Sequence, residues 1–311
     1  MQVASEAPSS FRTSAHRPGG LSLVTTAWRE AVSRRRLMQY LVQADVKKKG
    51  TDTILGNVWW LLDPLLAMAV YVFVMQVIFQ RKIEDFPLYL LAAVIPFKWF
   101  TQTVGDSVTV VTRNGPIIKQ ISFPKITLVI AGAMSEVISF MFGMGLLIVL
   151  SIVLYGGHHM SLQLLWVPVI AAIQFVFTLG FVLVISAITV FYRDVGIIIG
   201  HMMRLLFFLS PVLWSLDPGA GGRGDAIRHA VGHTGFLIVS YNPIAILLTS
   251  YRHVIFGVVG KVNPDTHQQG WTAPITPELK ALGFLAIFSI LLLIFGTWVF
   301  KRLEPAFAKV L

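Results

Sequence analysis

The sequence contains no cysteine among its 311 residues. A disulfide framework is therefore excluded, and so are thiolate metal sites and a cysteine nucleophile. Histidine is present, but His158, His159, His229, His233, His253 and His267 are scattered without the spacing of a metal site. We therefore predict no metal in this chain.

Charge is also scarce. Only 13% of the residues are charged, whereas a soluble domain carries roughly a quarter. Hydrophobic residues make up 55%, and they come in blocks of about 20, the length that crosses a bilayer as a helix. The ten-residue alternating segments of a membrane β-barrel are absent. We therefore predict an all-α polytopic membrane protein with six transmembrane helices, at about 58–79, 86–111, 126–155, 162–191, 195–216 and 279–300.

Motifs for catalysis are missing as well. No G-x-x-x-x-G-K-[ST] sequence occurs, so the chain does not bind ATP through a P-loop of its own. Neither H-E-x-x-H nor G-x-S-x-G is found. We predict that the chain is not an enzyme and needs no cofactor of its own, and that it forms a passage whose energy comes from elsewhere.

The basic residues that are present lie mostly on one side of the predicted spans. Sixteen of the 25 lysines and arginines fall before the first span, in the loops at 112–125 and 192–194, or after the last span. Seven fall in the alternate connections. The positive-inside rule therefore places both termini on the cytoplasmic side of the membrane. We predict that this membrane is a bacterial inner or plasma membrane.

The segments outside the spans have distinct compositions. Residues 1–25 are expected to be a disordered cytoplasmic leader and 303–311 a cytoplasmic tail. Residues 26–57 contain a basic helical stretch at 28–49, which is typical of a helix lying on the inner membrane surface, followed by a connector. The segment 235–260 is apolar but broken, so we expect short re-entrant helices on the outer side.

Charges near or inside the spans admit two interpretations each. Lys98 either reaches a membrane surface or faces an internal cavity, and Arg204 either lines a pathway or pairs with an acid such as Glu136. In the turn between the fourth and fifth spans, Arg193 follows the positive-inside rule, and Asp194 is expected to cap the next helix. Transmission of motion through this turn is a further hypothesis.

Several stretches follow one another in an order that resembles a known family: "ADVKKKGTDTILGNVWWLLDPLL", "FPLYLLAAVIPFKWF", "TRNGPIIKQISFPK", "FYRDVGIIIGHMMRLLFFLSPVLWSL" and "YNPIAILLTSYRHVIF". They resemble the membrane subunit of type-two ABC exporters, in the branch that exports polysaccharides. The resemblance implies a permease that exports a lipid-linked polysaccharide such as O-antigen, capsule or a teichoic-acid-like polymer. It also implies a homodimer that binds two separate ATPase subunits, which hold ATP and magnesium.

By position in that family, the loop after the second span carries a helix that docks on the ATPase, flanked by the helix at 28–49. The residues expected to couple to the ATPase, together with the turn between spans four and five, are Asn114, Ile117, Ile118, Lys119, Phe123, Pro124, Lys125, Tyr192, Arg193 and Asp194.

A glycan passage needs aromatic faces with few fixed charges, because sugars stack on rings without being held in place. The residues expected along the pathway are Trp59, Trp60, Tyr71, Lys98, Trp99, Phe100, Arg204, Phe207, Phe208 and Trp214. Bases at the inner surface are expected to steer the lipid phosphate into it: Arg34, Arg35, Arg36, Lys47, Lys48 and Lys49.

Other functions remain as alternatives. An exporter of a small lipid or drug would need a smaller and more uniformly apolar pocket. A membrane enzyme acting on lipid-linked sugar would need acids or histidines clustered at one membrane face, whereas the acids near the spans are dispersed. An ion channel would need a filter-like repeated loop, which is absent. No nucleic-acid partner is expected, since the basic residues follow membrane topology.

Overall fold

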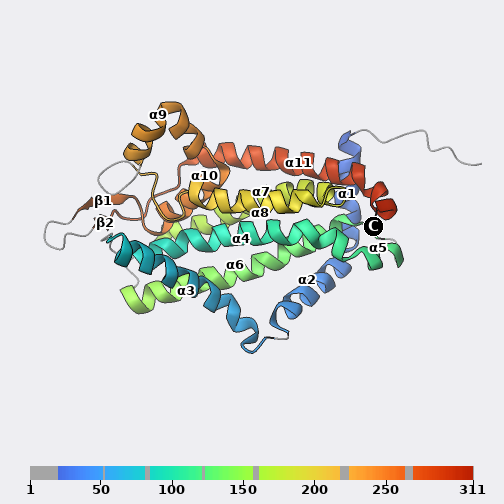
Figure 1. Cartoon of the computed structure of the whole chain (residues 1–311), viewed down its shortest axis with the longest axis horizontal. Coiled ribbons are helices and arrows are strands. Elements are labelled where there is room, and N and C mark those ends of the chain that lie inside the picture. The colour runs from blue at the N-terminus through green and yellow to red at the C-terminus, as the bar shows by residue number, and fades with distance from the viewer. Residues whose placement is uncertain are drawn as a thin grey trace, which may run out of the picture.

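The computed structural model describes residues 20–51, 53–80, 85–120, 123–156, 161–217, 224–262 and 269–310 (Figure 1). Residues 1–19 of the expected leader lie outside the described residues. The elements in chain order are α1 (Gly20–Ser33), α2 (Arg35–Gly50), η1 (Gly56–Val58), α3 (Trp59–Val72), η2 (Phe73–Ile78), α4 (Phe86–Arg113), α5 (Gly115–Gln120), α6 (Ile126–Tyr155), η3 (Leu162–Trp166), α7 (Val167–Thr189), α8 (Asp194–Leu209), α9 (Gly224–Ser240), α10 (Pro243–Ile255), β1 (Val259–Val262), β2 (Gln269–Trp271) and α11 (Leu279–Val310).

The long helices α4, α6, α7, α8 and α11 run along the long axis of the molecule (Figure 1). One end of this bundle carries α1, α5 and the last turns of α11, and we call it the α5 end. The opposite end carries α9, α10 and the pair β1–β2, and we call it the hairpin end.

The fold is predominantly helical, as predicted. Four helical stretches in the described part of the chain are long and apolar enough to cross a membrane: Trp59–Ile78, Ile126–Leu154, Leu162–Thr189 and Leu279–Phe307. The pair Gly232–Ser240 and Pro243–Ile255, bent by 70°, makes a fifth if it is counted as one broken span. The prediction of an all-α fold missed one feature of the described residues, the short antiparallel strand pair β1–β2.

The other two predicted spans are also helices, but they differ from ordinary membrane helices. α4 has 28 residues and carries Lys98, Asp106 and Arg113 along its length. α8 has 16 residues, so its length is about 24 Å, less than the hydrocarbon thickness of about 30 Å. It ends at Leu209, with Ser210 as its cap directly before Pro211, because proline lacks the backbone N–H that would continue the helix.

The amino-terminal region differs from the single surface helix that we predicted. Helix begins at Gly20, inside the expected leader, and breaks at Arg34 into α1 and α2. The two pieces have different supports: α1 buries Val24, Ala27 and Ala31 and packs on α11, whereas α2 packs on α6. A straight helix would not satisfy both contacts, so the chain turns at the arginine run.

The closest packing in the bundle is between α7 and α11. A Cβ atom added to Gly180 would lie 2.7 Å from the backbone nitrogen of Leu293, and one on Gly296 would lie 2.4 Å from the carbonyl oxygen of Gly180. Small residues that let helix backbones approach closely are typical of membrane helix pairs. This contact fixes the centre of the bundle, between the two ends.

Candidate functional site

A cleft of about 410 Å³ opens where α2 and α3 meet α4 and α6. Its lining mixes charged and aromatic side chains, although the helices that form it are mostly apolar. Four acids and four bases line it: Asp45, Asp63, Asp106, Glu136, Lys48, Lys49, Lys98 and Arg113. The rings of Trp59, Trp60, Trp99 and Phe140 complete the wall. We call this the charged cleft.

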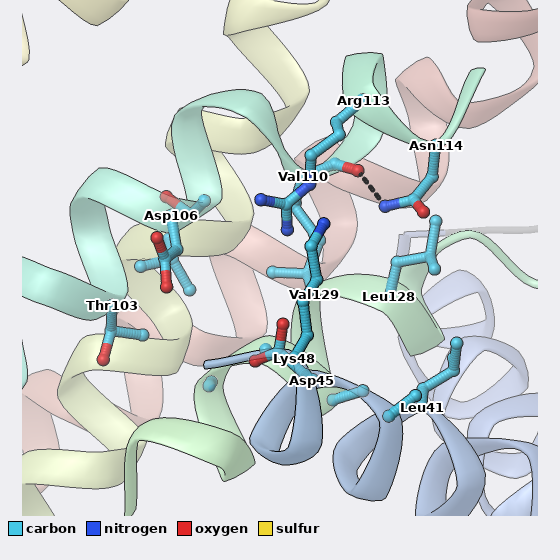
Figure 2. A pocket seen from close by; sticks show the side chains of 16 residues that line it. Leu41, Asp45, Lys48, Thr103, Asp106, Val110, Arg113, Asn114, Leu128 and Val129 are labelled. Atoms are coloured by element: carbon cyan, nitrogen blue, oxygen red, sulfur yellow. Dashed lines mark hydrogen bonds between the residues drawn. The ribbon is translucent and has the colours of Figure 1, made fainter. Parts of the chain in front are cut away.

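A smaller hollow of about 170 Å³ continues the charged cleft toward α5. Asp45, Lys48, Asp106 and Arg113 line both spaces. Figure 2 shows Asp45 and Lys48 from α2 and Asp106 and Arg113 from α4 around the same hollow. At its edge the Asn114 side chain donates a hydrogen bond of 2.7 Å to the carbonyl oxygen of Val110. Asn114 is the residue that caps the end of α4, directly before α5.

Ion pairs between distant elements hold the cleft together. Lys49, in the last turn of α2, pairs with Glu136 of α6, which is only 3% exposed. The same ammonium lies 3.7 Å from the Asp45 carboxylate. A cation in the last turn also complements the dipole of α2. The basic end of α2 is therefore anchored on α6.

Lys98 lines the charged cleft and pairs there with Asp63 of α3. The side chains of the two residues are 31% and 59% exposed, so this pair is open to whatever fills the cleft. With four charges of each sign, the lining has no formal net charge. Such a site holds a polar ligand through local contacts, while its tryptophans offer flat apolar faces.

The predicted pathway residues separate into groups. Trp59, Trp60, Lys98 and Trp99 line the charged cleft, and Trp99 stacks on Phe140 with ring centroids 4.4 Å apart. Phe100 lies elsewhere: it is 2% exposed and stacks on Phe177 of α7 at 5.7 Å, so it belongs to the core. Neighbours on a helix point in directions about 100° apart, which explains the difference.

The other aromatic residues form a second cluster between α3, α4 and α8. Tyr71 stacks on Phe207 at 5.3 Å, and Phe207 also contacts Phe97 and Phe208. Phe208 is largely exposed. Trp214, beyond the end of α8, donates a hydrogen bond of 3.3 Å to the carbonyl oxygen of Phe208.

Of the two interpretations of Arg204, the structure does not support the pair with Glu136, because Glu136 pairs with Lys49 and Arg204 is exposed on α8. The expectation that Asp194 caps α8 was wrong. Asp194 is the first residue of α8 and not its cap, because the cap position is occupied by Arg193. Its carboxylate still lies in the first turn, where it complements the helix dipole.

The residues expected to couple to an ATPase gather at the α5 end. Ile117, Ile118 and Lys119 lie in α5, where Ile118 is buried and Lys119 is exposed. Phe123 and Pro124 lead to Lys125, whose backbone N–H donates to Glu304 of α11 at 2.8 Å. The turn with Tyr192 and Arg193 lies at the same end, since the neighbouring Phe191 contacts Phe307 of α11 at 5.9 Å.

The basic residues predicted to meet lipid phosphate are divided between two places. Arg34, Arg35 and Arg36 are exposed at the break between α1 and α2. Lys47 is exposed on α2, whereas Lys48 and Lys49 line the charged cleft. The structure thus brings the end of α2 together with Lys98 and Trp99, but leaves the arginine run outside.

Sequence reasoning missed a buried cation at the hairpin end. Arg252 of α10 is 3% exposed, and its guanidinium donates hydrogen bonds to the carbonyl oxygens of Tyr89, Pro211, Val212 and Trp214. It also lies over the Tyr89 ring, 3.8 Å from its centroid. The signal in the sequence was one arginine in an apolar helix that starts with an Asn242–Pro243 cap.

The next residue, His253, donates from Nε2 to the Asp217 carboxylate at 2.9 Å. Asp217 also accepts from the Ser215 hydroxyl at 2.7 Å. Arg252 and His253 therefore attach the chain that follows α8 to α10 at successive points.

The chain matches the sequence pattern of a family described as ABC-2 type transporter over residues 25–218. This range includes α2, α3, α4 and α6, which form the charged cleft, and α5 with the turn before α8.

The chain is also similar to transport proteins along most of its length. It is 26% identical to the O-antigen export system permease protein RfbA of Myxococcus xanthus, covering 90% of this chain and 97% of that protein. The protein of the same name from Klebsiella pneumoniae is 25% identical over 88% of this chain and 95% of its own. The polysialic acid transport protein KpsM of Escherichia coli is 19% identical over 81% and 87%.

Proposed function

The chain belongs to the ABC-2 type transporter family, and from this membership we propose that it is the permease subunit of an ABC exporter of polysaccharide. The observation that carries the proposal is the likeness to O-antigen export permeases over about nine-tenths of the chain. A chain with several apolar helices that is similar to such permeases is a multi-pass membrane protein.

The finer topology is part of the proposal. Six spans cross the cytoplasmic membrane: α3 with η2, α4, α6, η3 with α7, α8 and α11. The α5 end faces the cytoplasm, as the positive-inside rule favours, and α9 and α10 dip into the outer leaflet. The short α8, on which Arg204 is exposed, is then protected from lipid by a second copy of the chain, with which the permease forms a homodimer.

The permease has no nucleotide-binding motif, so ATP and magnesium bind to two separate ATPase subunits at the α5 end. The helix α5 and the turn at 190–194 contact them. Supporting this arrangement, α5 packs on α11, and Phe191 of the turn contacts Phe307 in the last turns of α11. Lys125, at the start of α6, is also attached there through Glu304. Movement of an ATPase against α5 would thus reach α11 directly.

The exported glycan is linked to a lipid, and the charged cleft with its surroundings receives it. An apolar hollow of about 550 Å³ lies between α3 and α6, lined by residues that include Leu61, Met141 and Phe142. The ring of Phe142 contacts Trp60 of the charged cleft at 5.1 Å. A polar cleft beside an apolar hollow suits a molecule with a phosphate head and a hydrocarbon tail.

In this arrangement Lys48 and Arg113 meet the phosphate, because both are exposed at the cleft. The exposed arginines at the α1–α2 break attract it to the membrane surface. The tryptophans Trp59, Trp60 and Trp99 then contact the sugars that follow. This chemistry favours a lipid-linked glycan over a small, uniformly apolar drug.

The test is deletion of the gene in its own cells, followed by measurement of polysaccharide on the cell surface and of lipid-linked glycan inside. We expect loss of the surface polymer, accumulation of the lipid-linked precursor, and recovery of both with the intact gene. Unchanged surface polymer would contradict the proposal. Purification in mild detergent should also capture an ATPase, with two copies of each subunit in the complex.

A further inference from the structure

A cavity of about 290 Å³ lies at the hairpin end, separate from the charged cleft. Its walls are formed by α9, by α10, by the start of α11 and by the segment that follows α8. The cavity lies at the opposite end of the bundle from α5 (Figure 1). Its lining includes Asp217, Phe236, Ser240, Tyr241, His253 and Glu278. Sites for small ligands occupy about 300 Å³ or more, so this space suits one small ring and not a chain.

The cavity has a fixed wall. Asp217 is held by His253 at 2.9 Å and by Ser215 at 2.7 Å, and its own backbone N–H donates to the Ser215 hydroxyl at 3.0 Å. The neighbouring Arg252 binds the carbonyl oxygens just before this segment. A ligand would therefore meet an acceptor that is already oriented, which reduces the entropy lost on binding.

The polar groups of the lining suit hydroxyls. Asp217 and Glu278 offer carboxylate oxygens, and Ser240, Tyr241 and Ser250 offer hydroxyls that both donate and accept. The Ser240 hydroxyl is buried and has no hydrogen-bond partner in the described part of the chain.

The charges of the lining exclude two other kinds of ligand. Neither lysine nor arginine is found among the described residues that line the cavity, so an anion such as phosphate would meet two carboxylates. Histidine, aspartate and glutamate do not form a group of three or more able to hold a metal ion among the described residues. The hydroxyls and carboxylate acceptors of the lining suit a ligand rich in hydroxyls.

Two aromatic rings complete this chemistry. Phe236 and Tyr241 lie on the α9 side, and Tyr241 is 54% exposed. A lining that combines aromatic rings with carboxylates matches a pyranose, which has apolar C–H faces and hydroxyl edges. We propose that this cavity binds a single neutral sugar ring, a subsite for the glycan at the hairpin end; the assignment to that glycan rests on the proposed export function.

The experiment uses the exporter complex, permease with ATPase, in lipid nanodiscs. Saturation-transfer NMR is recorded with methyl glycosides of glucose, galactose and mannose as probes. We expect transfer to the ring protons of at least one glycoside, and binding about fivefold weaker in Tyr241→Ala, because an aromatic contact is removed. Glu278→Gln should also weaken binding. Asp217→Asn tests whether the oriented carboxylate accepts a hydrogen bond from the sugar. If that variant does not fold, Tyr241→Ala and Glu278→Gln still test the proposal, because both residues are exposed.

The matched control is Ile238→Ala. Ile238 is 69% exposed on α9, close to Tyr241 in the chain, and does not line the cavity, so its loss should leave sugar binding unchanged. Absence of transfer to every glycoside, or equal transfer in the Tyr241→Ala complex, would overturn the proposal. The result is independent of the deletion test: loss of surface polymer without sugar transfer would leave the export function standing and remove only this site.

Discussion

The charged cleft and the hairpin end neutralise their charges in different ways. In the charged cleft, side chains pair with side chains from distant helices, as Lys49 does with Glu136 and Lys98 with Asp63. At the hairpin end, the buried cation Arg252 is satisfied by backbone carbonyl oxygens, and three of these come from one short segment. Side-chain pairs can exchange partners when helices shift, whereas an arginine bound to carbonyls fixes the backbone itself.

This difference teaches where the molecule is built to adapt. The charged cleft is a set of exchangeable contacts around an open space, close to the proposed ATPase surface. The hairpin end is a fixed frame around a smaller cavity. Substitutions in the charged cleft and at the hairpin end should therefore separate into those that affect the fold and those that affect the transport cycle.

The largest effect is expected from Arg252→Ala. Four carbonyl oxygens would lose a charged donor inside the protein, a change expected to cost more than about 4 kcal/mol in the free energy of unfolding. Thermal unfolding of the purified complex measures it, with the exposed Arg228→Ala as control. Equal melting temperatures for the two variants would break the comparison, because Arg252 would then not fix the hairpin end.

A smaller effect on stability is expected from Glu136→Gln, because it leaves Lys49 without its principal partner; breaking a buried pair costs about 3 kcal/mol. The reversed pair, Lys49→Glu with Glu136→Lys, should recover part of this loss, which a double-mutant cycle in thermal unfolding measures. Asp45→Asn, at the longer 3.7 Å contact, serves as the control. If the reversed pair were no better than Glu136→Gln alone, the contact would not be an exchangeable ion pair.

The smallest effect on stability is expected from Asp63→Asn. The carboxylate is 59% exposed, and exposed pairs contribute less than about 1 kcal/mol. Its consequence should instead be found in transport, since Lys98 would be released into the charged cleft. We expect an unchanged melting temperature and a changed ratio of glycan exported to ATP hydrolysed. A variant that melted far below the wild type would contradict this expectation, because the Lys98–Asp63 pair would then stabilise the fold.

Hydropathy predicted the helices well, because apolar length is a property of each segment alone. It could not predict which face of a helix meets which neighbour. Trp99 and Phe100 are adjacent and equally aromatic, yet one lines the charged cleft and the other packs in the core. The neighbours α6 and α7 decide this, and their positions depend on the whole bundle.

The pairs of the site were harder to predict for the same reason. Lys49 and Glu136 are 87 residues apart, and no spacing in the sequence connects them. For Arg252, the sequence offered an arginine in a broken apolar segment, but its partners are backbone atoms, which leave no trace in side-chain identity. Motif reasoning detects groups that act together through spacing, and these groups act together only through the fold.

The contact between α1 and α11 has a consequence for how the protein is made. Glu30 pairs with Lys301, 271 residues further along the chain, and Gly20 lies against the Trp298 ring. On a ribosome, one partner is synthesised near the start and the other near the end. The first helix therefore cannot take its place until translation is almost complete. Until then the surface formed by Val24, Ala27 and Ala31 lacks the helix that covers it, and this distinguishes an unfinished chain from a finished one.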